Sequence, residues 1–347
     1  MRQHMRFLIA LALVVFLAAG LLTALLGSSL WEVAWVQAVQ GDAGLRLPMQ
    51  IITFFGDEAF FFLLVPLFFW CVDKALGIDL ALLLVTSAFA NGLCKGFFKH
   101  PRPFWGQPGL RLSDATSFAL PSGHSQNAAV LAGYTGWVIV GAGRSRASLG
   151  RWISAIALGV AAGLVALSRV YLGVHFPGDV IWGVAVGLGV LAGYILLQTR
   201  LRSWLGRLPL WGHILLATAA AGLAFVLNQT ALAIPFGSGA AFGELYAEAY
   251  STTLAEAANL AGMILGLGIG LALEARYVRF AVDGPGWKRA VRYLVGMAGL
   301  LAIWMGLRVL FPQEPMAVGL ALRVVRYGLA FLWAIVVWPW LFVRARL

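Results

Sequence analysis

DVIWGVAVGLGVLAGYILLQ, residues 179–198, is a run of twenty residues whose one charge, Asp179, stands at its start. Twenty apolar residues wound into an α-helix cover the ~30 Å hydrocarbon core of a bilayer. Similar runs recur near 7–27, 58–72, 76–94, 122–141, 152–168, 208–227, 254–273, 290–311 and 320–343. The pattern predicts an all-α integral membrane protein with about ten transmembrane helices. We interpret the first run as a retained helix, because it lacks a small-residue cleavage site.

The composition favours the same class. Of 347 residues, 61% are hydrophobic and 11% are charged, and the mean hydropathy is +0.87. The formal net charge is +11, but the basic residues stand in short clusters between apolar runs, which argues against a nucleic-acid partner. Cys71 and Cys94 lie inside apolar runs and are predicted to be packing residues. The sequence contains no DxD, ExxH or HxxxH pattern, so we expect no metal site and no cofactor.

Basic residues on alternate connections indicate the topology. Sixteen of the 25 lie on one side if ten helices alternate: Arg2, Arg6, Lys74, Arg144, Arg146, Arg151, Arg200, Arg202, Arg207, Arg276, Arg279, Lys288, Arg289, Arg292, Arg344 and Arg346. Because cytoplasmic loops are enriched in Lys and Arg, we expect a bacterial-type plasma (inner) membrane protein with both termini in the cytoplasm. Residues 30–40 suit an interfacial segment. The connections near 95–121 and 169–178 lie on the outer side but are rich in basic residues, which the positive-inside rule does not predict. An anionic substrate is the simplest explanation for these basic residues.

Those two outer connections hold three blocks of polar residues. The blocks are KGFFKHPRP at 95–103, PSGH at 121–124 and SRVYLGVHFPGD at 168–179. Written as patterns, they are K-x6-RP, PSGH and SR-x5-H-x3-D.

Together the blocks resemble the signature of the type 2 phosphatidic acid phosphatase (PAP2) superfamily, which includes lipid phosphate phosphatases. The resemblance covers about residues 55–200 and implies a six-helix PAP2-like catalytic core within 1–200. About four additional C-terminal transmembrane helices, in 201–347, form an extension of unknown role. Gly56-Asp57-Glu58, followed by Trp70, Asp73 and the Lys95 block, is also similar to the sphingosine-1-phosphate phosphatase branch.

The residue types fit phosphoryl transfer on chemical grounds. Without a metal, the phosphate oxygens must be met by cations, and Lys95, Arg102 and Arg169 supply three of them. Ser122 and Gly123 stand at the start of a predicted helix, where free N–H groups and the helix dipole favour an anion.

Two histidines are the candidate catalytic groups. His175 and Asp179 are separated by a Pro-Gly turn, which can fold the carboxylate back onto one imidazole nitrogen and leave the other free. Asp179 is also a candidate N-cap of the following helix. The resemblance implies that His175 attacks phosphorus to give a phosphohistidine, and that His124 protonates the leaving alkoxide and then activates water.

Other charged groups have simpler interpretations. His100 and His213 are expected to be structural or interfacial histidines, and Lys99 and Arg111 either set the local field or are solvated. Arg308, Arg323 and Arg326 either pair with Glu256 or Glu314 or bind lipid.

The predicted function is a metal-independent membrane phosphatase that hydrolyses a lipid phosphate monoester or pyrophosphate at the outer face. Its partners are the membrane lipid substrate and the bilayer. A lipid phosphotransferase with the same site stays open, as does a transporter or flippase hybrid that uses the C-terminal helices. A transporter alone is disfavoured, because the charged residues gather at a membrane face and not at mid-membrane.

Overall fold

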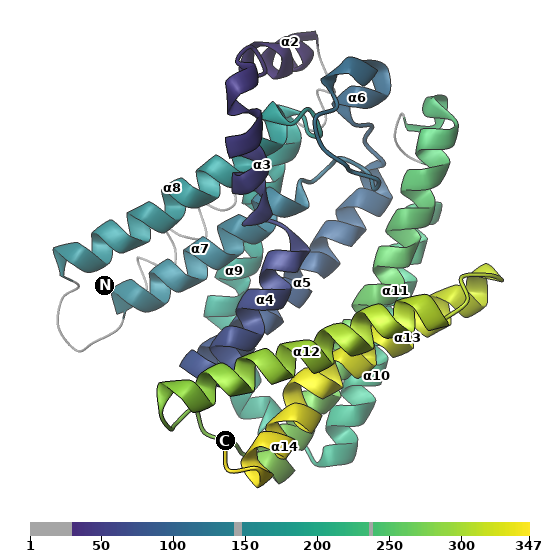
Figure 1. The fold of residues 1–347 in the computed structure, drawn as a ribbon. Coiled ribbons are helices and arrows are strands. Elements are labelled where there is room, and N and C mark those ends of the chain that lie inside the picture. Colours follow the sequence, from purple (N-terminus) through teal and green to yellow (C-terminus); the bar gives the residue numbers. More distant parts are fainter. Residues whose placement is uncertain (1–29, 142–147, 236–238) are drawn as a thin grey trace. The chain divides into compact units, whose positions relative to one another are not determined.

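The computed structural model describes residues 30–141, 148–235 and 239–347, and within these ranges all regular structure is helical (Figure 1). The predicted helix 7–27 lies outside the described residues. The main helices are α2 (Leu30–Val39), α3 (Arg46–Phe54), α4 (Glu58–Leu67), α5 (Lys74–Phe98), α6 (Pro103–Gly106), α7 (Gly123–Gly141), α8 (Leu149–Tyr171), α9 (Pro177–Leu205), α10 (Leu210–Ala233), α11 (Glu244–Leu273), α12 (Gly286–Leu310), α13 (Met316–Leu332) and α14 (Trp338–Arg344).

Each predicted apolar run within the described residues forms a helix. Seven helical segments are long and apolar enough to cross a membrane, or eight if the bent pair Ala43–Phe54 and Glu58–Val72 forms one span. The predicted run 122–141 forms α7, which is not among the seven; its first turns contain His124, Gln126 and Asn127. The chain is a multi-pass integral membrane protein.

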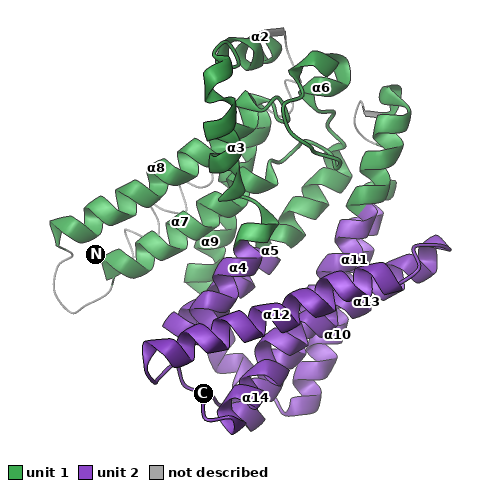
Figure 2. Ribbon diagram, viewed as in Figure 1, with its two compact units in different colours: residues 1–60, 86–198, 231–253 green, residues 61–85, 199–230, 254–347 purple. Residues whose placement is uncertain are grey.

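The helices form two compact units (Figure 2). Unit 1 comprises residues 1–60, 86–198 and 231–253, and unit 2 comprises residues 61–85, 199–230 and 254–347. The units are interleaved in the sequence, because α5, α9 and α11 each contribute to both.

In unit 1, glycines allow α9 to approach the start of α7 very closely. A Cβ added at Gly183 would lie 2.5 Å from the backbone oxygen of Ser122, and one at Gly187 would lie 2.5 Å from that of Gln126. No ordinary side chain fits at such a distance, so the helices meet here only because these residues are glycine. The backbone N–H of Ser122 also donates to the carbonyl of Asp179 (3.0 Å). The first turns of α7 and α9 are thereby held together.

Buried polar side chains connect α5 to α7. Gln126 donates to the carbonyl and the hydroxyl of Ser87 (2.7 and 2.8 Å) and accepts a hydrogen bond from Asn91 (2.9 Å). Asn91 also donates to the carbonyl of Pro121 (3.2 Å). Satisfied polar groups of this kind specify one arrangement of the helices around them. They fix the PSGH turn against α5, the helix that carries Lys95.

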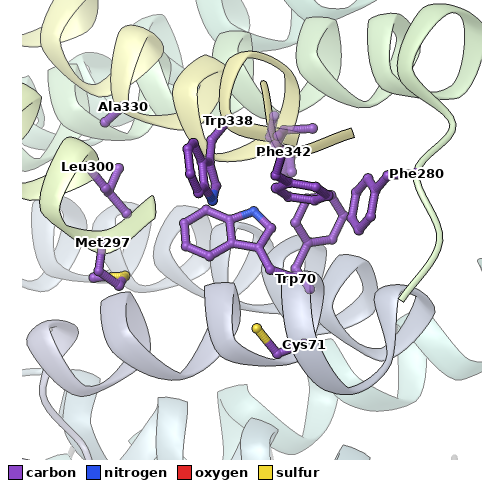
Figure 3. Packing of buried hydrophobic residues seen from close by; sticks show 11 residues of the cluster. Trp70, Cys71, Phe280, Met297, Leu300, Ala330, Trp338 and Phe342 are labelled. Atoms are coloured by element: carbon purple, nitrogen blue, oxygen red, sulfur yellow. The ribbon is translucent and has the colours of Figure 1, made fainter. Parts of the chain in front are cut away.

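Unit 2 has an aromatic core. Trp70, Phe280, Trp338 and Phe342 pack together with Cys71 and with aliphatic residues of α12 and α13 (Figure 3). The indole N–H of Trp70 donates to the carbonyl of Ala334 at 2.8 Å, so the one polar atom of this buried ring is satisfied. Cys71 is buried in this core, as predicted for a packing residue.

Pairs of glycines four residues apart have different surroundings on different helices. A Cβ at Gly262 would lie 2.4 Å from the backbone oxygen of Val324, and one at Gly266 would lie 2.6 Å from that of Gly328, so α11 and α13 are in close contact. At Gly159 and Gly163 nothing lies within 4 Å of an added Cβ, so the same spacing on α8 marks no close helix packing within the described residues.

Candidate active site

The three sequence blocks meet in unit 1, where they supply a group of buried charged side chains. Lys95, Arg102, Arg169, His175 and Asp179 are each at most 8% exposed. Charged groups are almost never buried to this degree unless they are paired or bind something. Lys95 Nζ and Arg102 Nε both donate to Ser117, and Arg102 Nη1 lies 3.2 Å from His175 Nε2. The group is therefore one site, not a set of separate ion pairs.

His175 lies in the connection between α8 and α9, against the guanidinium of Arg102. Arg102 Nη1 is 3.2 Å from His175 Nε2 and donates to the carbonyl of Val174 at 2.8 Å. Its Nε donates to the carbonyl of Ser117 at 2.6 Å. A guanidinium has only donors, so Nε2 faces it with a lone pair and the imidazole proton belongs on Nδ1.

Burial and the positive charge of Arg102 both disfavour the imidazolium form of His175. They hold the pKa of this side chain well below its usual range. At neutral pH the imidazole is uncharged, which is the state that a nucleophile requires.

The two carboxylate oxygens of Asp179 contact different partners. Oδ2 accepts the backbone N–H of Phe176 at 2.8 Å and lies 3.6 Å from His175 Nδ1, which is longer than a direct hydrogen bond. Oδ1 lies 3.0 Å from Nδ1 of His100.

The structure corrects the expectation that Asp179 is an N-cap. The helix α9 begins at Pro177, so Asp179 is its third residue. Its carboxylate reaches back to the N–H of Phe176, which precedes the first helical residue, as the acidic member of a capping box does.

Two residues at this carboxylate were not predicted as part of the site. His100 was expected to be structural or interfacial, and it contacts Asp179 directly. Glu32 of α2 is 2% exposed and accepts the backbone N–H of Gly178 at 2.9 Å. Burial raises the pKa of Glu32 to about 7, with a smaller contribution from the negative charge of Asp179. The only sequence signal for His100 is its place inside the first block, and Glu32 has none.

His124 stands at the second position of α7, beside a further acid. Its Nε2 is 3.5 Å from Oδ2 of Asp57, and both side chains are partly exposed. A Cβ at Gly56 would lie 2.9 Å from the Cβ of His124, so glycine there allows this approach. Burial and the positive charge of Arg169 lower the pKa of His124 to about 4, against the opposing effect of Asp57. The free imidazole is therefore an uncharged base at neutral pH.

The other two cations of the site donate to neutral hydroxyl groups. Lys95 Nζ donates to the hydroxyl of Ser117 at 2.8 Å, and Arg169 Nη1 donates to that of Thr53 at 2.7 Å. Arg169 Nε is buried without a hydrogen-bond partner among the described residues. Such an orphaned donor fits an oxygen of a bound anion.

The PSGH turn adds backbone donors at the start of α7. Ser122 is fully buried and its N–H is used by Asp179, whereas Gly123 is the first residue of α7 and has no intrahelical acceptor for its N–H. Of this pair, Gly123 is the donor best suited to an anion.

Comparisons with known proteins match two parts of the chain. A model described as the PAP2 superfamily matches residues 76–203. A second model, described as PAP2 superfamily phosphatase, transmembrane extension, matches residues 258–347. The first range contains all three blocks.

Related proteins come from bacteria and eukaryotes. A protein of Escherichia coli named as a candidate undecaprenyl-diphosphatase is 33% identical over 153 residues, which are 41% of this chain and 72% of the relative. A dihydrosphingosine 1-phosphate phosphatase of Schizosaccharomyces pombe is 30% identical over 139 residues, 38% of this chain. The match spans 33% of that relative's length.

Among solved structures, the chain is similar to a transmembrane PAP2 type phosphatidylglycerolphosphate phosphatase from Bacillus subtilis. The TM-score is 0.44 at 26% identity, over 54% of this chain and 96% of that chain.

Proposed function

Because the chain belongs to the PAP2 superfamily, we propose that it is a membrane phosphatase that removes a phosphoryl group from a lipid phosphate monoester or pyrophosphate. The observation that carries the proposal is the environment of His175. This imidazole is buried and uncharged, with its Nε2 lone pair directed at Arg102 Nη1 (3.2 Å) and its Nδ1 toward Asp179. A neutral imidazole beside a phosphate-binding guanidinium suits nucleophilic attack on phosphorus.

The reaction proceeds in two displacements. His124 takes up a proton once the negative charge of the bound phosphate offsets the charge of Arg169. His175 Nε2 then forms a bond to phosphorus while the bond from phosphorus to the lipid oxygen breaks, and His124 gives its proton to that oxygen. Water then attacks the phosphohistidine and gives a proton to His124, and the bond between nitrogen and phosphorus breaks to release inorganic phosphate. When a phosphate oxygen binds Arg102, it accepts the N–H that otherwise points at His175 Nε2. Substrate binding therefore leaves the lone pair of Nε2 free to attack phosphorus.

The protein's own cations neutralise the negative charge of the phosphoryl group in the transition state. Arg102 and Arg169 are each 4% exposed and Lys95 is 8% exposed, so they act where water screens them little. We propose that they make the reaction independent of metal. Activity should persist in EDTA, and vanadate should inhibit, because a pocket for a transferring phosphoryl group also holds a trigonal-bipyramidal oxyanion. An absolute requirement for Mg²⁺ would contradict this.

The site is proposed to face the outside of the cell. Arg151 lies in the first turn of α8 and Arg169 in the last, and a helix of 23 residues is about 35 Å long. The site therefore lies at the membrane face opposite to the basic connection that precedes α8, which the positive-inside rule assigns to the cytoplasm. Both termini are then cytoplasmic.

His175→Ala tests the proposal directly. Lipid phosphate labelled with ³²P should give an acid-labile phosphoenzyme in the wild type and none in the variant, which should still insert and elute as a single species in detergent. The lipid class is identified by phosphate release from phosphatidate, phosphatidylglycerophosphate, sphingosine-1-phosphate and undecaprenyl pyrophosphate. Release with water as the only acceptor distinguishes a phosphatase from a phosphotransferase. A variant that retains full turnover would overturn the mechanism.

A further inference from the structure

A short turn joins α3 to α4 (Figure 1) and brings an acid to His124. Asp57 precedes the first residue of α4, and its Oδ1 accepts the backbone N–H of Ala59 at 2.8 Å, as the N-cap of a helix does. Its Oδ2 lies 3.5 Å from His124 Nε2. The imidazole holds the pKa of Asp57 below its usual range, so the carboxylate is ionised at neutral pH. One oxygen of Asp57 thus caps a helix and the other faces a candidate catalytic histidine.

Packing on two helices of the site fixes the position of this turn. A Cβ added at Gly56 would lie 2.9 Å from the Cβ of His124 on α7 and 2.6 Å from Cγ1 of Val165 on α8. At these distances glycine is the residue that fits without displacing a neighbour. The hydroxyl of Thr53, near the end of α3, accepts a hydrogen bond from Arg169 Nη1 at 2.7 Å. The turn therefore holds Asp57 beside His124 through contacts that do not involve the carboxylate.

The charged groups around His124 act in opposite directions. In the described part of the chain, Arg169 of α8 and Lys95 of α5 disfavour the imidazolium form, and Asp57 favours it. Without substrate, burial and the two cations prevail, and the imidazole is uncharged. A bound phosphate offsets the two cations, so the attraction of Asp57 then favours the imidazolium. Hydrogen bonds of catalytic groups are often long in the free enzyme and shorten in the complex, as the 3.5 Å separation allows.

We propose that Asp57 is a positioning residue for the acid–base step, because its carboxylate orients the imidazole of His124 through Nε2 and stabilises the protonated ring while substrate is bound. This role rests on the proposed phosphatase function. A carboxylate beside one imidazole nitrogen keeps a proton there and leaves the other nitrogen to exchange protons, without being protonated itself. Nδ1 of His124 is therefore the atom that protonates the lipid oxygen. It takes a proton from the attacking water in the second displacement, and that proton passes to solvent when phosphate leaves.

The test compares Asp57→Asn with the wild type, using the lipid phosphate that the wild type hydrolyses fastest, in mixed micelles between about pH 5 and 9. Asparagine keeps the shape of the side chain and an oxygen for the N–H of Ala59, but removes the negative charge. The value of kcat should fall roughly tenfold or more, whereas KM should not rise, because Asp57 repels the phosphate and does not bind it. The alkaline fall of kcat should move down by roughly 1 pH unit, since the protonated ring loses its counter-charge.

Asp42→Asn is the matched control. Asp42 is an exposed acid of the same unit, and its Oδ1 accepts the N–H of Gly44 at 2.8 Å at the start of the short helix η1 (Ala43–Leu45). The substitution removes the same charge from the same kind of cap and should leave kcat and its pH dependence unchanged. Asp57→Ser is a second uncharged variant for the case that Asp57→Asn does not fold. Serine is a good N-cap, and this variant should show the same shift of the alkaline fall.

Three results would count against this role. An alkaline fall of kcat that stays in place in the uncharged variants overturns it, and an equal shift in Asp42→Asn would assign the effect to net charge. A lower Tm in detergent with wild-type kcat per folded molecule would show that Asp57 only caps α4. The proposed function fails in a distinguishable way, because a wild type that hydrolyses no lipid phosphate reveals this without any variant.

Discussion

Replacing His100 with phenylalanine removes the hydrogen bond to Asp179 Oδ1 (3.0 Å) and leaves that oxygen without its partner in a carboxylate that is 1% exposed. A hydrogen bond to a charged group contributes about 1.5–3 kcal/mol. One factor of ten in rate corresponds to about 1.36 kcal/mol. If the bond is fully formed in the transition state, kcat should fall roughly 10- to 150-fold.

The effect is expected on kcat and not on KM. His100 acts through Asp179, whose other oxygen faces His175 Nδ1 (3.6 Å), so it would position the proposed nucleophile. The assay is phosphate release from a lipid phosphate in mixed micelles, with Tm measured on the same samples.

A conservative variant separates this role from a structural one. In His100→Asn the amide nitrogen takes the place of Nδ1 and can donate the same bond, so kcat should stay within a few-fold of the wild type. A lowered Tm with an unchanged kcat per folded molecule would show that the bond only stabilises the fold. Wild-type kcat in His100→Phe would refute the reasoning.

Three further outcomes follow from the same structure. Burial raises the pKa of Glu32 from 4.5 to about 7. Protonation of Glu32 therefore stabilises the folded state fully below about pH 4.5, and this contribution is lost as the pH rises through 7. Glu32→Gln should therefore flatten the fall of Tm between pH 5 and 7.5, and equal slopes would contradict this. Gly183→Ala places a Cβ 2.5 Å from a backbone oxygen of the PSGH turn and should lower both Tm and kcat, whereas Gly159→Ala meets nothing within 4 Å in the described part of the chain and should change neither. Finally, with the native cysteines replaced by alanine, Asp114→Cys should react with an impermeant maleimide in intact cells and Ser148→Cys only after lysis; both positions are exposed, and the reverse pattern would place the site in the cytoplasm.

The length of the apolar runs predicted which segments form helices, because a bilayer admits only segments whose backbone hydrogen bonds are satisfied internally. It predicted the helix ends less well. The run at 254–273 ends where α11 ends, but α11 begins ten residues earlier, at Glu244. The early turns, ELYAEAYSTT, are polar, and hydropathy marks only the part of a helix that suits the membrane interior. Intrahelical hydrogen bonds continue beyond it.

The three blocks were recognisable in the sequence because each is short, and their residue types already indicate chemistry with an anion. The partners of those residues were not. Asp57 is 67 positions before His124, and Glu32 is 146 positions before Gly178. Nothing local marks either acid as part of a site. Packing of α2 and of the turn after α3 brings them there.

Residue types and spacing by themselves determined the class of this protein, a helical membrane protein with a cationic, histidine-containing site, because membrane insertion and phosphate chemistry depend on local composition. Only the tertiary structure decided which acid meets which histidine and which glycines are in contact. Gly262 and Gly266 have the same spacing as Gly159 and Gly163, yet among the described residues only the first pair has a helix against it. His100 becomes part of the site because Asp179, far along the chain, is left with a free oxygen that faces it. A buried carboxylate needs partners on every side, and those partners come from whichever helices the fold places around it.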